Sequence, residues 1–109
     1  MAVMTLRQVC DTCGVSRRAV QGYERAGLVS ASRRNERGYL LYDIDEQERI
    51  RQIRFYQQIG FTIKEIQVLL KSSEAELKER LWKQAKKLEH EKKEKEDLIK
   101  KVYELIERL

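Results

Sequence analysis

Two cysteines, Cys10 and Cys13, have the spacing in this 109-residue chain that most directly suggests chemistry. A C-x-x-C pair can cycle between dithiol and disulfide, or supply two of the four ligands of a structural zinc site. A zinc site would need two more ligands, and the single histidine, His90, stands far along the chain. We therefore expect structural cysteines, with no metal and no cofactor. A thiol-based sensor through Cys10 and Cys13 stays open as an alternative.

The sequence lacks the residue sets that enzymes use for nucleophilic or acid–base catalysis. One histidine is present, and the carboxylates are scattered among basic residues rather than set in pairs. We predict no catalytic residue and no enzyme activity. The apolar runs are only a few residues long, so neither a membrane-spanning helix nor a signal peptide is expected. These features predict a cytoplasmic protein that does not enter a membrane.

The basic residues carry the remaining chemistry, and they point to a polyanionic partner. The chain holds 23 Lys and Arg against 18 Asp and Glu, a net charge of +5. Residues 1–71 contain 12 basic and 8 acidic residues, whereas residues 72–109 contain 11 and 10. The positive excess therefore lies in the first part, and nucleic acid is the partner that such an excess favours.

Capping signals divide this first part into short helices. Thr5, followed three residues later by a glutamine, predicts a capped helix over 6–13, which Gly14 ends. Ser16 is a good N-cap for a second helix over 17–26. Two short helices joined by a glycine turn form the helix-turn-helix pattern, whose second helix enters the major groove of DNA.

One face of the predicted second helix is basic, polar and small. Arg18, Gln21, Gly22 and Arg25 recur at i, i+3, i+4 and i+7, so they share that face. Arg17 adjoins it. Arginines can reach phosphates or guanine edges, and glutamine can pair with adenine. Glycine in mid-helix costs about 1 kcal/mol relative to alanine, which fits a helix backbone that must approach a partner closely at this point. The equally open alternative is that Gly22 has no function on a solvated face.

A basic loop and a short strand follow. Residues 30–38 are predicted to form a loop, and residues 39–42 a strand. Arg33, Arg34 and Arg37 lie in that loop, which we interpret as a wing over the phosphate backbone. The hydroxyl of Tyr39 is a further candidate for a phosphate contact.

Three more helices are predicted to begin after Asp43, Thr62 and Ser73, each followed three residues later by glutamate. Phe55, Tyr56 and Phe61 are expected in the core.

The last helix has a continuous heptad seam and needs a partner to cover it. The helix is roughly 50 Å long at 1.5 Å per residue. A single helix of this length cannot cover its own apolar stripe, so another helix must pack against it. A parallel pair would set Glu91 and Lys95 each against its own copy, whereas an antiparallel pair lets opposite charges meet. We predict an antiparallel homodimer, with folding back on the same chain as the alternative. The predicted dimer interface is Leu77, Leu81, Leu88, Leu98, Val102, Leu105 and Leu109; Gln84, Glu91 and Lys95 complete the seam.

The first 70 residues resemble the MerR family of bacterial transcription regulators. The matching residues are Thr5-Leu6-Arg7-Gln8-Val9, Gly14-Val15-Ser16, Arg18, Tyr23-Glu24, Gly27-Leu28-Val29, Arg34, Gly38-Tyr39, Tyr42 and Gly60-Phe61-Thr62-Ile63-Lys64-Glu65-Ile66. The resemblance implies a homodimer held by an antiparallel coiled coil, binding to a palindromic promoter site, and distortion of that promoter DNA. It adds RNA polymerase at the promoter as a candidate partner. Gln21 and Gly22 depart from the Arg-Tyr that the family favours there.

We therefore predict a mainly α fold in two parts. Residues 1–72 form a winged helix-turn-helix DNA-binding domain, and residues 73–109 form a coiled-coil dimerisation helix. The chain is expected to be a short member of the family that lacks a C-terminal effector domain. The alternative function is a protein–protein interaction module on the same scaffold. The predicted DNA-binding residues are Ser16, Arg17, Arg18, Gln21, Gly22, Tyr23, Arg25, Arg33, Arg34, Arg37 and Tyr39.

Overall fold

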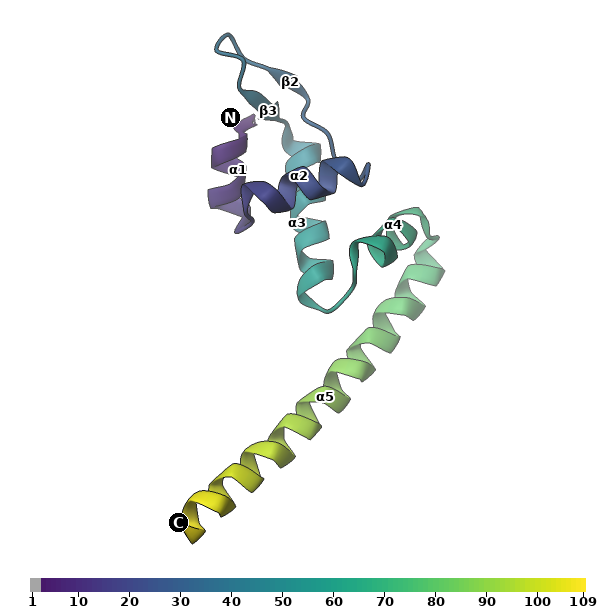
Figure 1. The fold of residues 1–109 in the computed structure, drawn as a ribbon. Coiled ribbons are helices and arrows are strands. Elements are labelled where there is room, and N and C mark those ends of the chain that lie inside the picture. Colours follow the sequence, from purple (N-terminus) through teal and green to yellow (C-terminus); the bar gives the residue numbers. More distant parts are fainter. Residues whose placement is uncertain (1–2) are drawn as a thin grey trace. The chain divides into compact units, whose positions relative to one another are not determined.

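The computed structural model describes residues 3–109 and is mainly helical. The chain divides into two compact units, Met1–Lys71 and Ser72–Leu109. Figure 1 shows the elements in chain order. The first unit contains strands β1 (Met4–Thr5), β2 (Arg33–Arg34) and β3 (Leu40–Tyr42), and helices α1 (Leu6–Cys13), α2 (Arg17–Arg25), α3 (Ile44–Gln58) and α4 (Ile63–Lys71). The second unit is one helix, α5 (Glu74–Arg108).

The predicted helix caps are present. Thr5 and Gln8 cap α1 reciprocally: the Gln8 N–H donates to Thr5 Oγ1 at 3.3 Å, and the Thr5 N–H donates to Gln8 Oε1 at 2.9 Å. Ser16 Oγ accepts from the Ala19 N–H at 3.0 Å and opens α2. Gly14, between the two helices, has φ of +67°, a left-handed conformation that strains other residues. The helix-turn-helix therefore forms from local signals, with α2 ending one residue earlier than predicted.

The sheet corrects the prediction for residues 30–38. They are not all loop, because Arg33 and Arg34 form β2 and pair antiparallel with Leu41 and Leu40. β1 pairs with the other side of β3, with Met4 opposite Tyr42, so the strand order is β1-β3-β2. Strands of two residues are too short to show the alternation that identifies a strand in a sequence.

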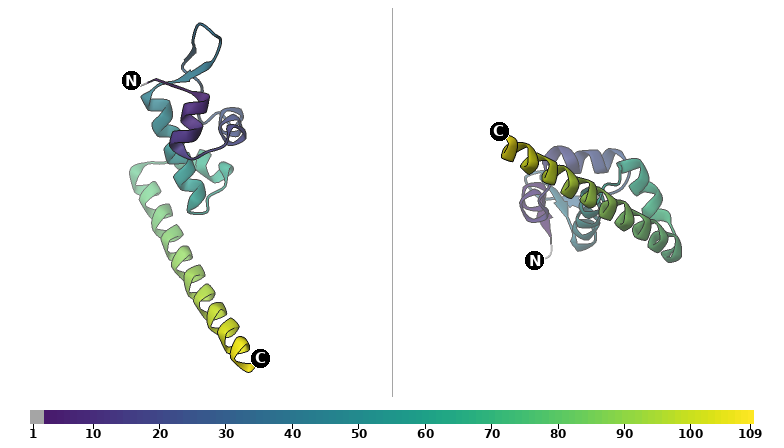
Figure 2. Two further views of the ribbon diagram at one scale, coloured as in Figure 1. Left: turned by 90° about the vertical axis from the view of Figure 1, so that its left-hand side faces the viewer. Right: turned by 90° about the horizontal axis from the view of Figure 1, so that it is seen from below.

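The core of the first unit lies between the helices, which Figures 1 and 2 show packed around α3. Ile50, Ile53 and Tyr56 of α3 are buried. Phe61 is also buried, and its ring meets that of Tyr56 edge-on at 6.3 Å. The expectation for Phe55 is wrong. Phe55 is 53% exposed, because it lies between the two α3 positions that face the core and projects from another side of the helix.

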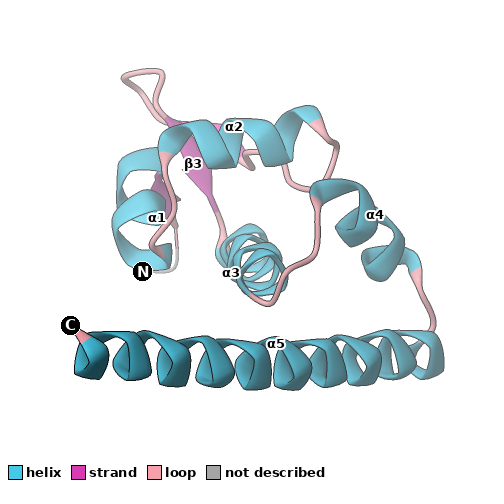
Figure 3. Ribbon diagram, turned by 60° about the horizontal axis from the view of Figure 1, so that its bottom comes forward, coloured by secondary structure: helices cyan, strands magenta, loops and turns pink. Residues whose placement is uncertain are grey.

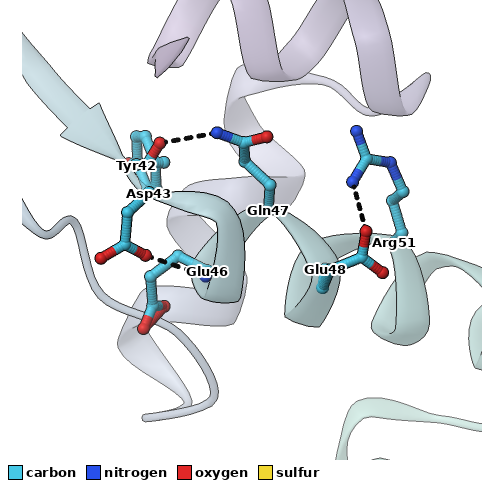
Figure 4. Close-up of polar contacts among 6 residues, drawn as sticks. All are labelled: Tyr42, Asp43, Glu46, Gln47, Glu48 and Arg51. Atoms are coloured by element: carbon cyan, nitrogen blue, oxygen red, sulfur yellow. Dashed lines mark hydrogen bonds and ion pairs between the residues drawn. The ribbon is translucent and has the colours of Figure 1, made fainter. Parts of the chain in front are cut away.

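The start of α3 is tied to β3 by a buried polar side chain that the sequence did not single out (Figure 4). Gln47 is only 4% exposed, and its Nε2 donates to the Tyr42 carbonyl at 2.8 Å. Asp43 caps the helix by accepting from the Glu46 N–H at 3.3 Å. The exposed Glu48–Arg51 ion pair in the same view, at 3.0 Å, adds little to stability.

Two tyrosine hydroxyls hold α2 in place. Tyr42 of β3 donates to Glu24 Oε1 at 2.5 Å, and Tyr23 donates to Gln57 Oε1 of α3 at 2.6 Å. Both rings are buried, and burial is the main reason why the pKa of each hydroxyl is raised. Hydrogen bonding to Glu24 raises the pKa of Tyr42 further. The helix is therefore fixed at its C-terminal half to both the sheet and α3.

The turn between β2 and β3 is held by one asparagine. Asn35 Oδ1 accepts from the N–H groups of Arg37 and Tyr39, at 2.9 and 3.0 Å. The Asn35 N–H donates to the Tyr39 carbonyl at 3.0 Å, and Gly38 has φ of +80°. This side chain closes the tip of the hairpin in the way that asparagine commonly stabilises turns.

Replacing Tyr42 by phenylalanine is expected to lower the free energy of unfolding by about 1.5–3 kcal/mol, because a hydrogen bond to a charged acceptor is lost. Urea titration followed by circular dichroism measures the change. Tyr39→Phe is the matched control, since the Tyr39 ring is 55% exposed and should change stability little. Equal stability of the two variants would contradict the role given to the Tyr42 hydroxyl.

Replacing Asn35 by alanine is expected to loosen the hairpin tip. Hydrogen exchange at the Arg37 and Tyr39 amides should accelerate about fivefold, because each loses a bond worth about 1 kcal/mol. Asn35→Asp keeps the acceptor oxygen and should stay close to the parent chain. Unchanged exchange in Asn35→Ala would show that the turn does not depend on this side chain.

Candidate nucleic-acid interface

The exposed face of α2 carries the predicted basic and polar set. Arg17, Arg18, Gln21 and Arg25 are exposed, and Val20, on the opposite face, is completely buried. Ser16 is exposed at the N-cap, where its oxygen is already used as an acceptor. The helix therefore presents three guanidinium groups and one amide outward, and no carboxylate lies among them. Such a face can contact phosphates and base edges.

Tyr23 does not belong to this face, which corrects its inclusion among the DNA-contacting residues. Its side chain is only 1% exposed, and its hydroxyl is bonded to Gln57. On a helix, Tyr23 follows Val20 and Ala19 at the inward spacing of three and four residues. Tyr23 therefore supports α2 from behind rather than contacting a partner.

Gly22 is not required by the fold. Its φ is not in the left-handed region, and a Cβ built there would meet only Arg25 Nη2, at 3.9 Å. That is ordinary contact with the end of a flexible side chain. Glycine inside a helix costs about 1 kcal/mol relative to alanine. The helix thus gains nothing from Gly22 itself, which keeps the close approach of a partner as the functional interpretation.

The hairpin formed by β2 and β3 places the second basic group. Arg33, Arg34, Arg37 and Tyr39 are all exposed. The Arg34 guanidinium donates through Nη1 to the Gly38 carbonyl at 2.6 Å, which leaves its other N–H groups for a partner. We call this hairpin, residues 33–42, the wing.

A hollow of about 500 Å³ links the wing to the helices. Arg7 of α1, Arg17 of α2 and Arg34 of the wing contribute to its lining, together with Thr5, Leu6, Gly38, Tyr39 and Leu40. No acidic side chain lines it. Three guanidinium groups around one concave surface create a positive potential that suits a phosphate. The sequence pattern does not identify Arg7 as part of this group, because its proximity to Arg17 and Arg34 exists only in the folded unit.

The two cysteines do not have the features of a reactive pair. Both thiols are free and partly buried, and burial is the main cause that raises the pKa of each. A raised pKa leaves a thiol protonated at neutral pH, whereas reactive cysteines have lowered values. Within residues 3–109, no three His, Cys, Asp or Glu side chains gather in a way that could hold a metal ion. The same residues include no helix long and apolar enough to cross a membrane.

Helix α5 presents its seam to the outside. Leu77, Leu81 and Gln84 are half-buried, and every later residue of the helix is exposed. Trp82 is exposed as well, with Lys86 Nζ at 5.2 Å from its ring centroid. The helix runs without interruption from Glu74 to Arg108, as Figure 3 shows, and Leu109, the last seam residue, is its C-cap. The other predicted dimer residues therefore lie along one continuous helix.

Comparison with known proteins gives one consistent family. The model "MerR HTH family regulatory protein" matches residues 4–73, and "MerR, DNA binding" matches residues 47–105. The mercuric resistance operon regulatory protein of Bacillus cereus is 38% identical over 63 residues, which are 58% of this chain and 48% of that protein. The HTH-type transcriptional activator mta of Bacillus subtilis is 31% identical over 97 residues, 89% of this chain and 38% of that protein.

Solved structures have the same fold. The N-terminal part of the Bacillus subtilis multidrug transporter activator, MtaN, superposes with a TM-score of 0.71 and 29% identity, covering 94% of this chain and 97% of that chain. HiNmlR, a MerR-family regulator lacking the sensor domain and bound to promoter DNA, superposes with a TM-score of 0.69. The superposition covers 90% of this chain and 85% of that chain at 19% identity, so it shows a shared fold only.

The curated relatives are longer proteins, and the chain spans between about a quarter and a half of their length. The interaction-module alternative is not favoured, because these relatives are described as transcriptional regulators and activators. A family match over most of the chain, together with a basic helix-turn-helix and wing, leads to one assignment: the chain belongs to the MerR family of transcription regulators and carries its DNA-binding domain.

Proposed function

We propose that this chain binds double-stranded promoter DNA as a homodimer at a palindromic site. In this proposal α2 lies in the major groove, with Arg18 and Gln21 at base edges, and Arg17 positions the helix on a phosphate. The wing holds the backbone through Arg33, Arg34, Arg37 and Tyr39. Ser16, Gly22 and Arg25 complete the contact surface, and Arg7 is added to it.

One observation supports this function most strongly. Arg17 of α2, Arg34 of the wing and Arg7 of α1 line one concave hollow that has no acidic lining, and the other exposed arginines of α2 and the wing lie outside it. Scattered surface arginines would not need to converge in this way. Phosphate contacts supply most of the affinity for DNA, and base contacts supply the sequence preference. The arginine-lined hollow can supply the phosphate contacts, and the polar face of α2 beside it can supply the base contacts.

The proposed regulatory step is a distortion of the promoter. Two copies joined by α5 would place two α2 helices on half-sites one helical turn apart, about 34 Å, or a multiple of it. If both α2 helices bind at once, the complex favours DNA that is bent or twisted so that the two half-sites face the dimer together. The free energy needed to bend and twist the DNA between them limits how large this deformation is. RNA polymerase at the same promoter is the proposed partner that responds to it. The proposed place of action is therefore the cytoplasm, where the protein would bind chromosomal DNA.

Arg18→Ala is expected to weaken binding to the specific site by about 1–3 kcal/mol, as loss of a base-edge contact does. Fluorescence anisotropy with a labelled duplex measures it. Lys100→Ala is the matched control, because it removes the same charge from the outer side of α5. Equal affinities for the Arg18 variant and the parent chain would remove Arg18 from the site.

Arg37→Ala should act differently from Arg18→Ala. A residue that contacts only phosphate weakens binding to all sequences alike and lowers the slope of log affinity against log salt by about one. Repeating the titrations at several salt concentrations on specific and scrambled duplexes gives both quantities. A loss restricted to the specific duplex would assign Arg37 to base readout instead.

Leu98→Glu is expected to convert the dimer to monomer, because it places a charge in the apolar seam of α5. Sedimentation equilibrium measures the mass, and Lys100→Glu introduces the same residue two positions away, outside the seam. DNA affinity should fall with the dimer, since two half-sites bound together gain avidity. An intact dimer in Leu98→Glu would refute this seam.

A further inference from the structure

The ten seam positions run from Leu77 of α5 to its C-cap, Leu109. They form complementary pairs with the same ten positions of a second copy that runs in the opposite direction. We propose that α5 pairs with a second copy of this chain in a single antiparallel register centred on Lys93. In that register Glu91 lies opposite the partner's Lys95, twice in each dimer, and these two ion pairs select both the register and the partner. The inference rests on the proposed homodimer and names the residues that specify it.

The register follows from the spacing of the seam. Antiparallel coiled coils stack layers in which an a position of one helix meets a d position of the other. Centred on Lys93, every seam position finds such a counterpart. The layers are Leu77 with the partner's Leu109, Leu81 with the partner's Leu105, Gln84 with the partner's Val102, Leu88 with the partner's Leu98, and Glu91 with the partner's Lys95. Three layers are apolar on both sides, and the central one joins opposite charges.

A shift by one heptad destroys this match. One direction sets Leu88 against the partner's Glu91 and leaves Leu105 and Leu109 uncovered. The other direction sets Glu91 against the partner's Val102 and Lys95 against the partner's Leu98. Each shifted register therefore places an unpaired charge against an apolar side chain, which is costly unless the charge finds an opposite partner.

The single chain leaves the seam charges available for this pairing. Glu91 and Lys95 are exposed and four residues apart, yet neither takes part in an ion pair anywhere in residues 3–109. Some charges outside the seam do pair along the helix: Glu79–Lys83 at 3.2 Å, Lys86–Glu89 at 3.6 Å and Lys93–Asp97 at 3.9 Å. His90 Nε2 lies 3.7 Å from Glu94 Oε1, which is an ion pair only when the imidazole is protonated.

The edges of the seam do not specify the register. Flanking positions would bring Arg80 near the partner's Arg108 and Lys87 near the partner's Lys101. These like charges lie at solvent-exposed edges, where salt screens them and each pair has a small effect. A third flanking pair, Ala85 with the partner's Ile99, extends the apolar contact. The choice of register must therefore come from the seam itself.

Disulfide trapping tests the register in a chain whose Cys10 and Cys13 are replaced by alanine. A mixture of Gln84→Cys and Val102→Cys chains should form a covalent dimer on mild oxidation, and neither chain alone should do so. Gln84→Cys mixed with Leu105→Cys is the mismatched control. Crosslinking of Gln84→Cys by itself would indicate a parallel pair. Absence of the mixed disulfide while the chains remain dimeric would overturn the register.

Charge reversal tests the selection. Glu91→Lys and Lys95→Glu should each raise the dimer dissociation constant about tenfold or more, because each sets like charges together twice in a buried layer. The double variant should return to within about threefold of the parent chain, since its ion pairs are restored in reversed order. An equimolar mixture of the two single variants should form heterodimers, counted by native mass spectrometry with one chain labelled with ¹⁵N.

Glu96→Lys, with the same charge change outside the seam, is the control and should leave the dissociation constant unchanged. If Leu98→Glu gives monomers while the reversals at Glu91 and Lys95 have no effect, the homodimer stands and this register fails. Failure of the double variant to recover would also overturn the pairing. A parent chain that is monomeric at tens of micromolar would overturn the proposed dimer together with the register.

Discussion

The hydrogen bond from Tyr42 to Glu24 joins the two parts of the interface that must act together. Tyr42 belongs to β3, a strand of the wing and the middle strand of the sheet, and Glu24 belongs to the helix that presents the outward arginines. The Tyr42 backbone carbonyl also accepts from Gln47 of α3, so one residue connects the wing, α2 and the central helix. Since a DNA duplex is rigid over this distance, helix and wing can engage it together only if their separation is fixed. This link holds β3 of the wing to α2, the two elements that place Arg34 and Arg17 at the hollow.

The local elements were predictable because their signals are local. Caps at Thr5, Ser16 and Ser73 and the glycine at position 14 determine where helices begin and end, and they need no tertiary information. Outward placement of Arg18 and Gln21 followed from helical spacing alone. What could not be predicted depends on contacts between distant residues: the two-residue strands β1 and β2, the burial of Gln47, and the hydroxyl bonds of Tyr23 and Tyr42.

The errors at Tyr23 and Phe55 have a different origin, because helical spacing is itself a local signal. Tyr23 matched a family motif and was placed with the contact residues, although its spacing from Val20 already indicated an inward position. Phe55 is expected in the core, whereas its position on α3 turns it away from the core and leaves it 53% exposed. Arg7 was overlooked because its proximity to Arg17 and Arg34 exists only in the folded unit. In α5 the pattern is linear, so the seam stays a prediction from the sequence alone, and the proposed antiparallel register adds the pairing of positions along that line.

The account's central claim is that the convergent arginines of α2 and the wing read a specific DNA site. Its most direct test is fluorescence anisotropy of the parent chain on the duplex upstream of its own gene and on a scrambled duplex, at low and at physiological salt. The account predicts a preference for the upstream duplex that persists at physiological salt, with affinity falling steeply as salt rises. Equal affinity for both duplexes, lost alike at physiological salt, would contradict sequence-specific regulation at that site.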